Sequence, residues 1–293
     1  MDKPKIAILY NFNDKAYHLG GSMQGVKNTI SYLEQFLISV NSIKTNWNTK
    51  TFTYEFYVIH SEPFTQIARK CIEEMGARII YVNWNHPTYL RTFCFTEPID
   101  CDYRLVLDND TFALQTPKFD FTKDILGSFG GCRYNQITSD SLCDSLSLKY
   151  PNSSPLSKID GFNWNAREYV DYYIHKNYED IFPYFNAGAL FIKNTISVEF
   201  GNLLNKSIPL AKNWANNRGL SIFLQDFYGL CVNDITSNWG AFETGFNFIL
   251  NPNLDGIKKI MNTYKDDISL IHYINCDAKS SYGKIILSEK LKI

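Results

Sequence analysis

The sequence predicts an α/β protein built on a doubly wound, mostly parallel sheet. Two observations predict this class: the first hundred residues contain continuous apolar runs, and these runs alternate with helical patterns. Continuous apolar runs are typical of strands that helices cover on both faces. Their alternation with helices is typical of parallel sheets. The chain has 293 residues, enough for a sizeable core, and we interpret 1–293 as a single domain.

The elements of the first half can be predicted in order. Four strands are expected, at 5–10, 56–59, 78–82 and 104–107. Three helices are expected between them, at about 22–40, 63–75 and 88–95. Ser22 is a candidate N-cap for the first helix. Its apolar residues fall on one face: Val26, Ile30, Leu33, Leu37 and Val40. Gly76 is expected to end the second helix.

The second half begins with a different composition. Residues 130–182 are polar and rich in Tyr, Asn and Ser, and we interpret them as a variable excursion within the domain. Regular patterns then return as predicted strands at 185–192 and 269–274, and as predicted helices at about 197–214 and 221–232.

The overall composition excludes some classes of protein. The 29 basic and 30 acidic residues give a formal charge of −1, which argues against a nucleic-acid partner bound through a basic face. The seven cysteines form no Cys-x-x-Cys pair, so free thiols in a reducing compartment are expected. No apolar run approaches the roughly 20 residues of a transmembrane helix, and the first run is short for a signal peptide. We therefore expect a soluble, cytoplasmic protein, and the sequence predicts no oligomeric state.

Asp108 and Asp110 are the strongest chemical signal. In an extended segment, side chains two residues apart point to the same face. Both carboxylates would then converge at the carboxyl edge of the sheet, where open α/β sheets bind ligands. Such a pair repels itself unless a cation lies between the carboxylates, and hard divalent ions prefer oxygen ligands. The alternative is a solvated turn after a strand, since Asp and Asn both favour turns.

Four blocks of sequence resemble glycosyltransferase family 8, the group of glycogenin and the bacterial lipooligosaccharide galactosyltransferases. In chain order they are Tyr89-Leu-Arg91, Arg104-Leu-Val-Leu-Asp-Asn-Asp110, Tyr184-Phe-Asn-Ala-Gly-Ala-Leu-Phe-Ile192, and Leu270-Ile-His-Tyr-Ile274 followed by Lys279. With the first strand, the resemblance spans about residues 5–280. It implies the GT-A fold, a Rossmann-like sheet with a nucleotide-diphosphosugar site at the carboxyl ends of its strands.

The resemblance also implies roles for particular residues. A divalent ion, Mn²⁺ or Mg²⁺, would bridge the diphosphate of the donor, and its implied ligands are Asp108, Asp110 and His272. The implied donor-binding residues are Tyr10, Asn11, Tyr17, Arg91, Asn109, Ala187, Gly188 and Lys279. The implied residues at the reacting sugar are Asn186, Gln225 and Asp226. Leu224 stands where the family usually has a further Asp.

Several of these residues also have ordinary structural interpretations. His272 could be a core residue of an apolar strand, and Lys279 a surface lysine. Arg91 could lie on a solvated helix face or pair with Glu97. Asn186 could mark a kinked strand entry, and Gln225 and Asp226 could be a helix cap or a surface pair.

The sequence therefore predicts a metal-dependent glycosyltransferase. It would transfer a sugar from a nucleotide diphosphate-sugar, a UDP-sugar in our interpretation, to a hydroxyl group of a glycan or other acceptor. The resemblance implies retention at the anomeric carbon, and residues 130–182 would form the acceptor side. The alternatives are a haloacid-dehalogenase-like phosphatase or a nucleotidyltransferase that uses Asp108 and Asp110, and a non-catalytic sugar-binding protein with a degenerate site.

Overall fold

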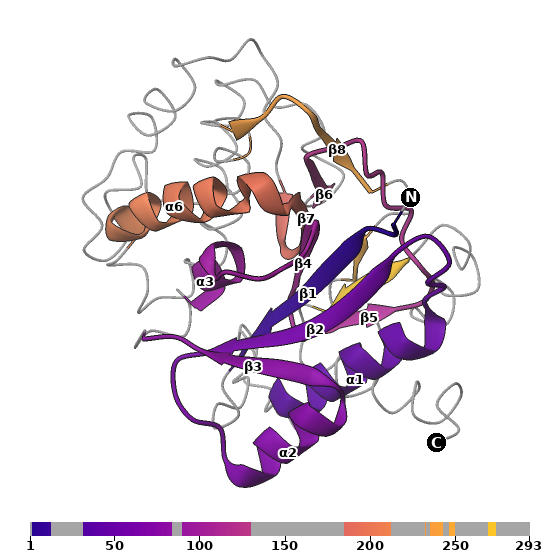
Figure 1. Cartoon of the computed structure of the whole chain (residues 1–293), viewed down its shortest axis with the longest axis vertical. Coiled ribbons are helices and arrows are strands. Elements are labelled where there is room, and N and C mark those ends of the chain that lie inside the picture. Colours follow the sequence, from indigo (N-terminus) through magenta and orange to yellow (C-terminus); the bar gives the residue numbers. More distant parts are fainter. Residues whose placement is uncertain are drawn as a thin grey trace.

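A seven-stranded sheet lies at the centre of the computed structural model, which describes residues 2–12, 32–83, 90–129, 185–211, 232, 235–242, 246–249 and 269–273. Across the sheet the strands are β3 (Ala77–Tyr81), β2 (Thr53–His60), β1 (Lys5–Asn11), β4 (Tyr103–Leu107), β7 (Phe185–Lys193), β6 (Ile125–Phe129) and β8 (Trp239–Ala241) (Figure 1). Six of these strands run in one direction, and β7 is antiparallel to both its neighbours. The predicted doubly wound, mostly parallel sheet is confirmed.

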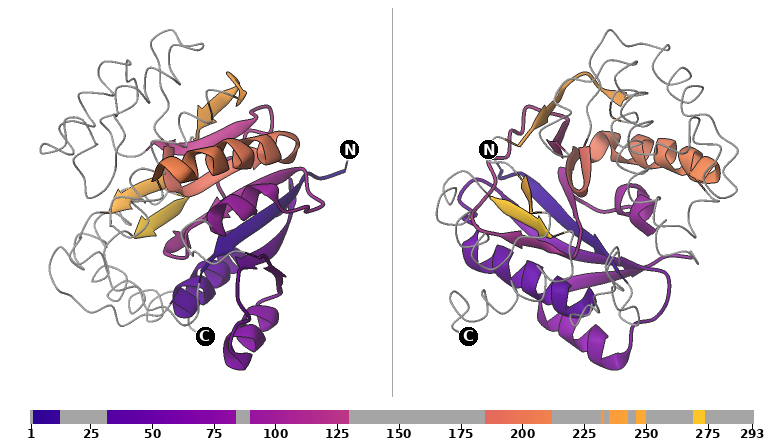
Figure 2. Two further views of the ribbon diagram at one scale, coloured as in Figure 1. Left: turned by 90° about the vertical axis from the view of Figure 1, so that its left-hand side faces the viewer. Right: turned by 180° about the vertical axis from the view of Figure 1, so that it is seen from behind.

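Helices cover both faces of this sheet. They are α1 (Tyr32–Asn46), α2 (Gln66–Glu74), α3 (Leu90–Thr96) and α6 (Asn194–Ala211). Tyr10 of β1 packs edge-on against Phe36 of α1, with ring centroids 5.1 Å apart. Arg104 of β4 points to the other face and contacts α3. Accordingly α1 packs with α2 and α3 packs with α6, and the views of Figures 1 and 2 show the two pairs apart from each other.

The first helix is buried differently from its prediction. Leu33 and Leu37 are only partly buried, and Val40 alone of the three predicted positions in the described helix is fully buried. The buried residues of α1 are Gln35, Phe36, Ser39, Val40, Ser42 and Ile43. The reason is that α1 faces the main sheet and also a second, short strand group. Its predicted start at Ser22 lies outside the described residues, and it continues to Asn46.

That second group is a three-stranded sheet in the order β5-β10-β9. Its strands are β5 (Thr111–Ala113), β10 (Leu270–Tyr273) and β9 (Phe246–Ile249). Of these only β10 was predicted, and β6 and β8 were also missed. Strands of three to five residues leave little periodicity in a sequence, and pairing with distant partners decides whether they form.

Gly76 follows the end of α2 as predicted, whereas the helix begins at Gln66, three residues after its predicted start at about 63. The Thr65 hydroxyl accepts a hydrogen bond from the Ala68 N–H at 3.3 Å, which caps the start of the helix. Gly76 follows the helix with a φ of 75°, a conformation that glycine adopts without steric cost. The predicted excursion at 130–182 lies outside the described residues, as does most of the predicted helix at 221–232. Among the helices that the structure describes, none is long and apolar enough to cross a membrane.

Candidate functional site

The carboxyl ends of β1 and β4 form the part of the sheet where a ligand is expected. In the order β3-β2-β1-β4, the chain leaves β1 toward β2 and later returns to the other side of β1 as β4. Open α/β sheets bind ligands at such a reversal of strand order. Asn11 is the last residue of β1, and Asp108 comes directly after β4. The predicted acidic pair therefore lies at the switch point of the sheet.

Asp108 and Asp110 belong to a turn and not to an extended strand. The Thr111 N–H donates to the Asp108 carbonyl at 3.2 Å, and the Thr111 hydroxyl donates to the same carbonyl at 2.8 Å. Our expectation that an extended backbone aligns the two carboxylates was therefore wrong about the backbone. Both aspartates are half-buried, and Asn109 between them is 7% exposed.

A series of hydrogen bonds between buried hydroxyl groups connects β1 and α1 to this turn. The Tyr10 hydroxyl lies 2.8 Å from Ser39 Oγ, and Ser39 Oγ lies 3.0 Å from Thr111 Oγ1. Each hydroxyl has one proton to donate. Because Thr111 gives its proton to the Asp108 carbonyl, Ser39 must donate to Thr111, and Tyr10 must donate to Ser39. The three hydrogen bonds therefore donate in the same direction, from β1 through α1 to the turn.

This arrangement corrects the role predicted for Tyr10. Its side chain is fully buried, its ring packs on Phe36, and its hydroxyl bonds to Ser39. Burial raises the pKa of Tyr10, so the phenol remains a proton donor. A ring without an exposed face cannot stack on a nucleobase, and Tyr10 supports the turn instead. Two serines, Ser39 and Ser42, lie within the apolar stripe of α1 and could have indicated these buried hydrogen bonds from the sequence. The prediction did not use them.

Arg91 reaches the same turn from the opposite face of the sheet. Near the start of α3, its Nη1 forms an ion pair with Asp108 Oδ1. The Arg91 side chain is 8% exposed and that of Asp108 is 31% exposed. This burial rules out the solvated helix face that was one alternative for Arg91. The guanidinium offsets the charge of the first predicted metal ligand.

The backbone of β7 brings the Asn186-Ala-Gly188 block beside the acidic turn. Leu107 pairs with Ala189, and the Asp108 N–H donates to the Gly188 carbonyl at 2.8 Å. Gly188 is buried. The side chains of Asn186 and Ala187 lie outside the described part of the structure, although their strand is described. The direct hydrogen bond joins two sequence blocks that are eighty residues apart.

The strand of His272 also borders this turn. In the three-stranded sheet, His272 pairs with Thr111, the residue directly after Asp110. The described part of His272 is its backbone. Tyr17, Gln225, Asp226 and Lys279 lie outside the described residues, so the roles predicted for them remain predictions.

Two amide side chains add oxygen atoms to this edge. Asn109 Oδ1 is buried and has no hydrogen-bond partner within the described structure. Asn11 Oδ1 lies 4.0 Å from the buried thiol of Cys94, the limit for a hydrogen bond to sulfur. Burial raises the pKa of Cys94 to about 12, so this group is a neutral thiol. A buried carbonyl oxygen without a partner costs free energy, and Asn109 is therefore suited to a ligand that donates a hydrogen bond or carries positive charge.

The donor atoms of the turn fit a hard divalent cation. Asp108 and Asp110 offer carboxylate oxygens, and Asn109 offers a buried amide oxygen; Mg²⁺ and Mn²⁺ prefer such ligands. Within the described residues, no group of three His, Cys, Asp or Glu side chains is placed to hold a metal ion. The third predicted ligand, His272, lies on a strand that borders the turn.

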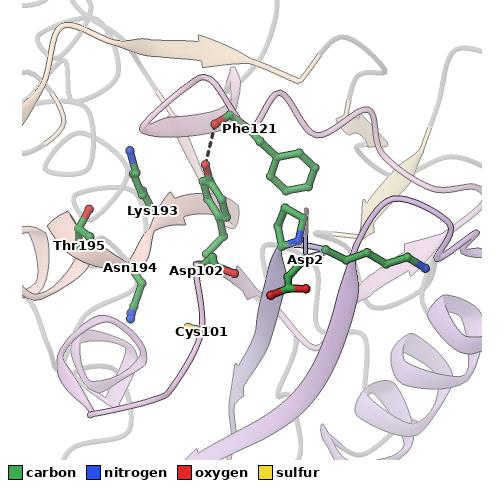
Figure 3. Close-up of a pocket in the computed structure, with 10 residues that line it drawn as sticks. Asp2, Cys101, Asp102, Phe121, Lys193, Asn194 and Thr195 are labelled. Atoms are coloured by element: carbon green, nitrogen blue, oxygen red, sulfur yellow. Dashed lines mark hydrogen bonds between the residues drawn. The ribbon is translucent and has the colours of Figure 1, made fainter.

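A separate pocket lies at the other end of the same strands. Its volume is about 440 Å³, and Figure 3 shows Asp102, Phe121, Lys193 and Asn194 around it. A hydrogen bond of 2.6 Å from the Tyr103 hydroxyl to the Phe121 carbonyl crosses one wall. The length of β4 separates this pocket from Asp108, about 17 Å at roughly 3.3 Å per residue. It is therefore distinct from the edge to which the sequence motifs point.

Known structures share this architecture. The chain is similar to the galactosyltransferase LgtC, solved in complex with donor and acceptor sugar analogs, with a TM-score of 0.53 and 14% identity over 98% of this chain and 96% of LgtC. It is also similar to the apo structure of the bifunctional glycosyltransferase WbbM, with a TM-score of 0.50 and 13% identity over 92% of this chain and 45% of WbbM. The chain has the GT-A fold.

The GT-A fold confirms the resemblance inferred from the four sequence blocks, at the level of architecture. LgtC is a member of glycosyltransferase family 8, the family that these blocks resemble. The sequence itself matches no family model and no curated protein. At 14% identity, the likeness concerns the fold alone.

Proposed function

We propose that this GT-A protein is a metal-dependent glycosyltransferase. It transfers a sugar from a nucleotide diphosphate-sugar, most simply a UDP-sugar, to a hydroxyl group of a glycan or other acceptor, with retention at the anomeric carbon. The observation that carries the proposal is the convergence of all four sequence blocks on one turn. Arg91 pairs with Asp108, Gly188 bonds to the Asp108 backbone, and the strand of His272 pairs with Thr111.

The chemistry of such a site requires charge control at the diphosphate. The diphosphate is the leaving group, and a divalent ion supplies Lewis-acid stabilisation of its developing charge when bound. Asp108, Asp110 and His272 would hold that ion. The Arg91 guanidinium, already buried at Asp108, would supply a further fixed positive charge to the diphosphate or to the donor sugar.

The donor sugar needs close contact with the protein backbone. Gly188 has no side chain, and its carbonyl already bonds to the Asp108 N–H. In the proposed site the donor sugar lies against this stretch of β7, where a residue without a side chain leaves more room than any other. Asn186 would hydrogen-bond a sugar hydroxyl, Gln225 would face the anomeric carbon, and Asp226 would lie beside it. Asn11, Tyr17, Asn109, Ala187 and Lys279 complete the proposed donor site.

A panel assay tests this proposal. The protein is incubated with nucleotide-sugars of different base and sugar, with and without Mn²⁺, and nucleotide release is measured together with the anomeric configuration of any product. We expect metal-dependent release from one donor. Phosphate release from simple monoesters, without nucleotide release from sugar donors, would favour a phosphatase. Neither release nor binding across the panel would overturn the transferase proposal.

A matched pair of variants tests the site. Asp110→Asn should lower Mn²⁺-dependent nucleotide binding at least tenfold, because a metal loses a charged ligand. Asp100→Asn is the control, because Asp100 is a fully exposed carboxylate in the loop before β4. Equal affinity in both variants would contradict the assignment of Asp110 to the metal.

A further inference from the structure

Arg104 is a buried charge that the proposed chemistry does not use. It lies on β4, four residues before Asp108, and is 1% exposed. A buried guanidinium is costly unless its donors find acceptors. Burial lowers the pKa of Arg104 from its ordinary value, yet arginine remains charged in proteins. The contacts that satisfy this charge show what the residue does.

Three hydrogen bonds of Arg104 lead to the segments that hold α3. Nη1 donates to the Cys94 carbonyl at 2.9 Å, and Nη2 donates to the Glu97 carbonyl at 2.6 Å. Nε donates to Asn194 Oδ1 at 2.7 Å. Cys94 lies in the last turn of α3 and Glu97 directly follows the helix. Carbonyls at a helix C-terminus lack partners within the helix and carry partial negative charge, so a guanidinium is well suited to them.

The same end of α3 is also fixed by α6. Phe95 packs on Phe200 with ring centroids 4.7 Å apart. Gly201 of α6 lies so close to α3 that a Cβ atom there would be 2.5 Å from Thr96 Cγ2. Asn194, which accepts from Arg104, also donates through Nδ2 to the Ile99 carbonyl at 3.3 Å. The C-terminal end of α3 is therefore held from the sheet by Arg104 and from the neighbouring helix by α6.

The other end of α3 carries Arg91. Cys94 and Arg91 are three residues apart, less than one helical turn. A helix as short as α3, Leu90–Thr96, has little stability of its own, so tertiary contacts decide its position. Any movement of α3 moves the Arg91 guanidinium relative to Asp108, and small errors of position are costly at a binding or reaction site.

We propose that Arg104 is a positioning residue: it anchors the C-terminal end of α3 to β4 and thereby holds Arg91 against Asp108. The anchoring of α3 stands on the contacts alone. Its consequence for ligand binding rests on the proposed function, in which Arg91 and Asp108 bind the metal-nucleotide donor. The two parts therefore need separate measurements.

The first measurement is hydrogen exchange of the ligand-free protein, read by mass spectrometry. The variant Arg104→Lys keeps the positive charge but loses the planar fork that reaches several carbonyls. Hydrogen bonds to a charged group are among the stronger ones, so we expect exchange in peptides covering α3 to accelerate about tenfold or more when they are lost. Peptides covering β1 and β2 should change far less. Unchanged exchange in α3 would overturn the proposal.

Two further variants serve as a control and as a second test for this measurement. Arg78→Lys is the matched control, because Arg78 lies on β3 of the same sheet with a side chain 68% exposed; it should leave α3 unaffected. Asn194→Ala removes one acceptor of Arg104 and keeps the arginine, and it should accelerate exchange in α3 by a smaller factor. It replaces Arg104→Lys if that variant fails to fold. Unchanged α3 exchange in this variant would then count against the proposal.

The second measurement is a double-mutant cycle on the affinity for Mn²⁺ with UDP, or with the nucleotide that the wild type binds best, by calorimetry. We expect Arg104→Lys to weaken binding about tenfold in the wild type and hardly at all in the Arg91→Gln background. A purely structural role would give additive losses, and additivity would overturn the proposal. If the wild type binds no metal-nucleotide, the proposed function fails, and hydrogen exchange alone decides whether Arg104 anchors α3.

Discussion

At the scale of single residues, the contact between Arg91 and Asp108 controls the charge of the acidic turn. A carboxylate with a guanidinium beside it is stabilised in its charged form, but it attracts a second cation less strongly than a lone carboxylate would. Asp108 is about one-third exposed, so solvent screens part of this effect. The site therefore combines a built-in positive charge with a pair of candidate metal ligands. A diphosphate would interact favourably with the Arg91 guanidinium and with a cation held by the two aspartates.

This balance of charges predicts that Arg91→Gln changes the affinity for metal alone and the affinity for metal with nucleotide in opposite directions. Binding of Mn²⁺ alone should become severalfold tighter, since Asp108 loses a competing positive charge. Binding of Mn²⁺ with UDP should become weaker, about tenfold for the loss of ~1.4 kcal/mol. Calorimetry with metal alone and with metal plus nucleotide measures both quantities, and Arg78→Gln on the exposed side of β3 is the control. Two changes of the same sign would contradict this account of the ion pair.

The structure brings Gly188 beside Asp108, although the two residues come from different strands. The metal and donor roles of Asp108, Asp110 and Gly188 remain predictions. Tyr10 was misassigned because burial decides whether an aromatic ring is a binding surface. Arg104 was seen only as the start of a strand. Which face of the strand it occupies, and which carbonyls lie there, depend on α3 and α6.

At the scale of elements, α3 brings Arg91 to the candidate site and takes its own position from its neighbours. It is short, it is capped by a residue of the sheet, and it packs on α6 through the close approach at Gly201. Elements with few internal hydrogen bonds take their position from their neighbours. A disturbance of the α3–α6 contact should therefore reach Arg91 at the other end of α3.

Gly201→Ala tests this dependence. The new Cβ would lie 2.5 Å from Thr96 Cγ2 and 3.0 Å from Phe95 Cβ, so the Thr96 side chain or one of the two helices must shift. We expect the free energy of unfolding to fall by roughly 1–3 kcal/mol, the usual cost of overpacking, and metal-nucleotide affinity to fall as well. Urea unfolding and calorimetry measure the two effects. At Gly240 the nearest atom to a new Cβ is Leu126 Cδ2 at 3.3 Å, so Gly240→Ala should be tolerated better.

The elements themselves were largely predictable, apart from the shortest strands. The apolar runs of β1, β2 and β4 are buried as expected, whereas β3 at the edge of the sheet is only partly buried. Thr65 and Gly76 delimit α2 as their conformational preferences require. Short strands such as β5 depend on partners that no local pattern reveals. The serines of α1 illustrate this point, because Ser42 donates its hydroxyl to the Ser39 carbonyl and accepts from the Ala113 N–H of β5 at 2.8 Å.

At the scale of the whole molecule, the candidate site is assembled from distant parts of the chain. Arg91 belongs to α3, Asp108 follows β4, Gly188 lies in β7 and His272 lies in β10. A ligand that contacts several of these segments links them in the folded state and binds the unfolded chain poorly. Its binding free energy must then add to the stability of the fold.

A thermal shift experiment measures this linkage. Mn²⁺ and UDP together should raise the Tm, because a ligand at a hundred times its dissociation constant adds about 2.7 kcal/mol to the free energy of unfolding. Mn²⁺ alone and UDP alone should each give a smaller shift. The Asp110→Asn variant should lose most of the combined shift. An equal shift in that variant would show that the ligands bind elsewhere.

The sequence by itself determined the class of the fold and the kinds of group at its candidate functional edge. Both follow from local properties: apolar runs form buried strands, and acidic, small and basic residues keep their chemistry wherever they lie. Only the tertiary structure decided that β7 runs antiparallel, that Tyr10 supports the acidic turn from the core, and that Arg104 caps α3 while Arg91 meets Asp108. These features depend on contacts between residues far apart in the chain, and burial and hydrogen-bond partners exist only once those residues have been brought together.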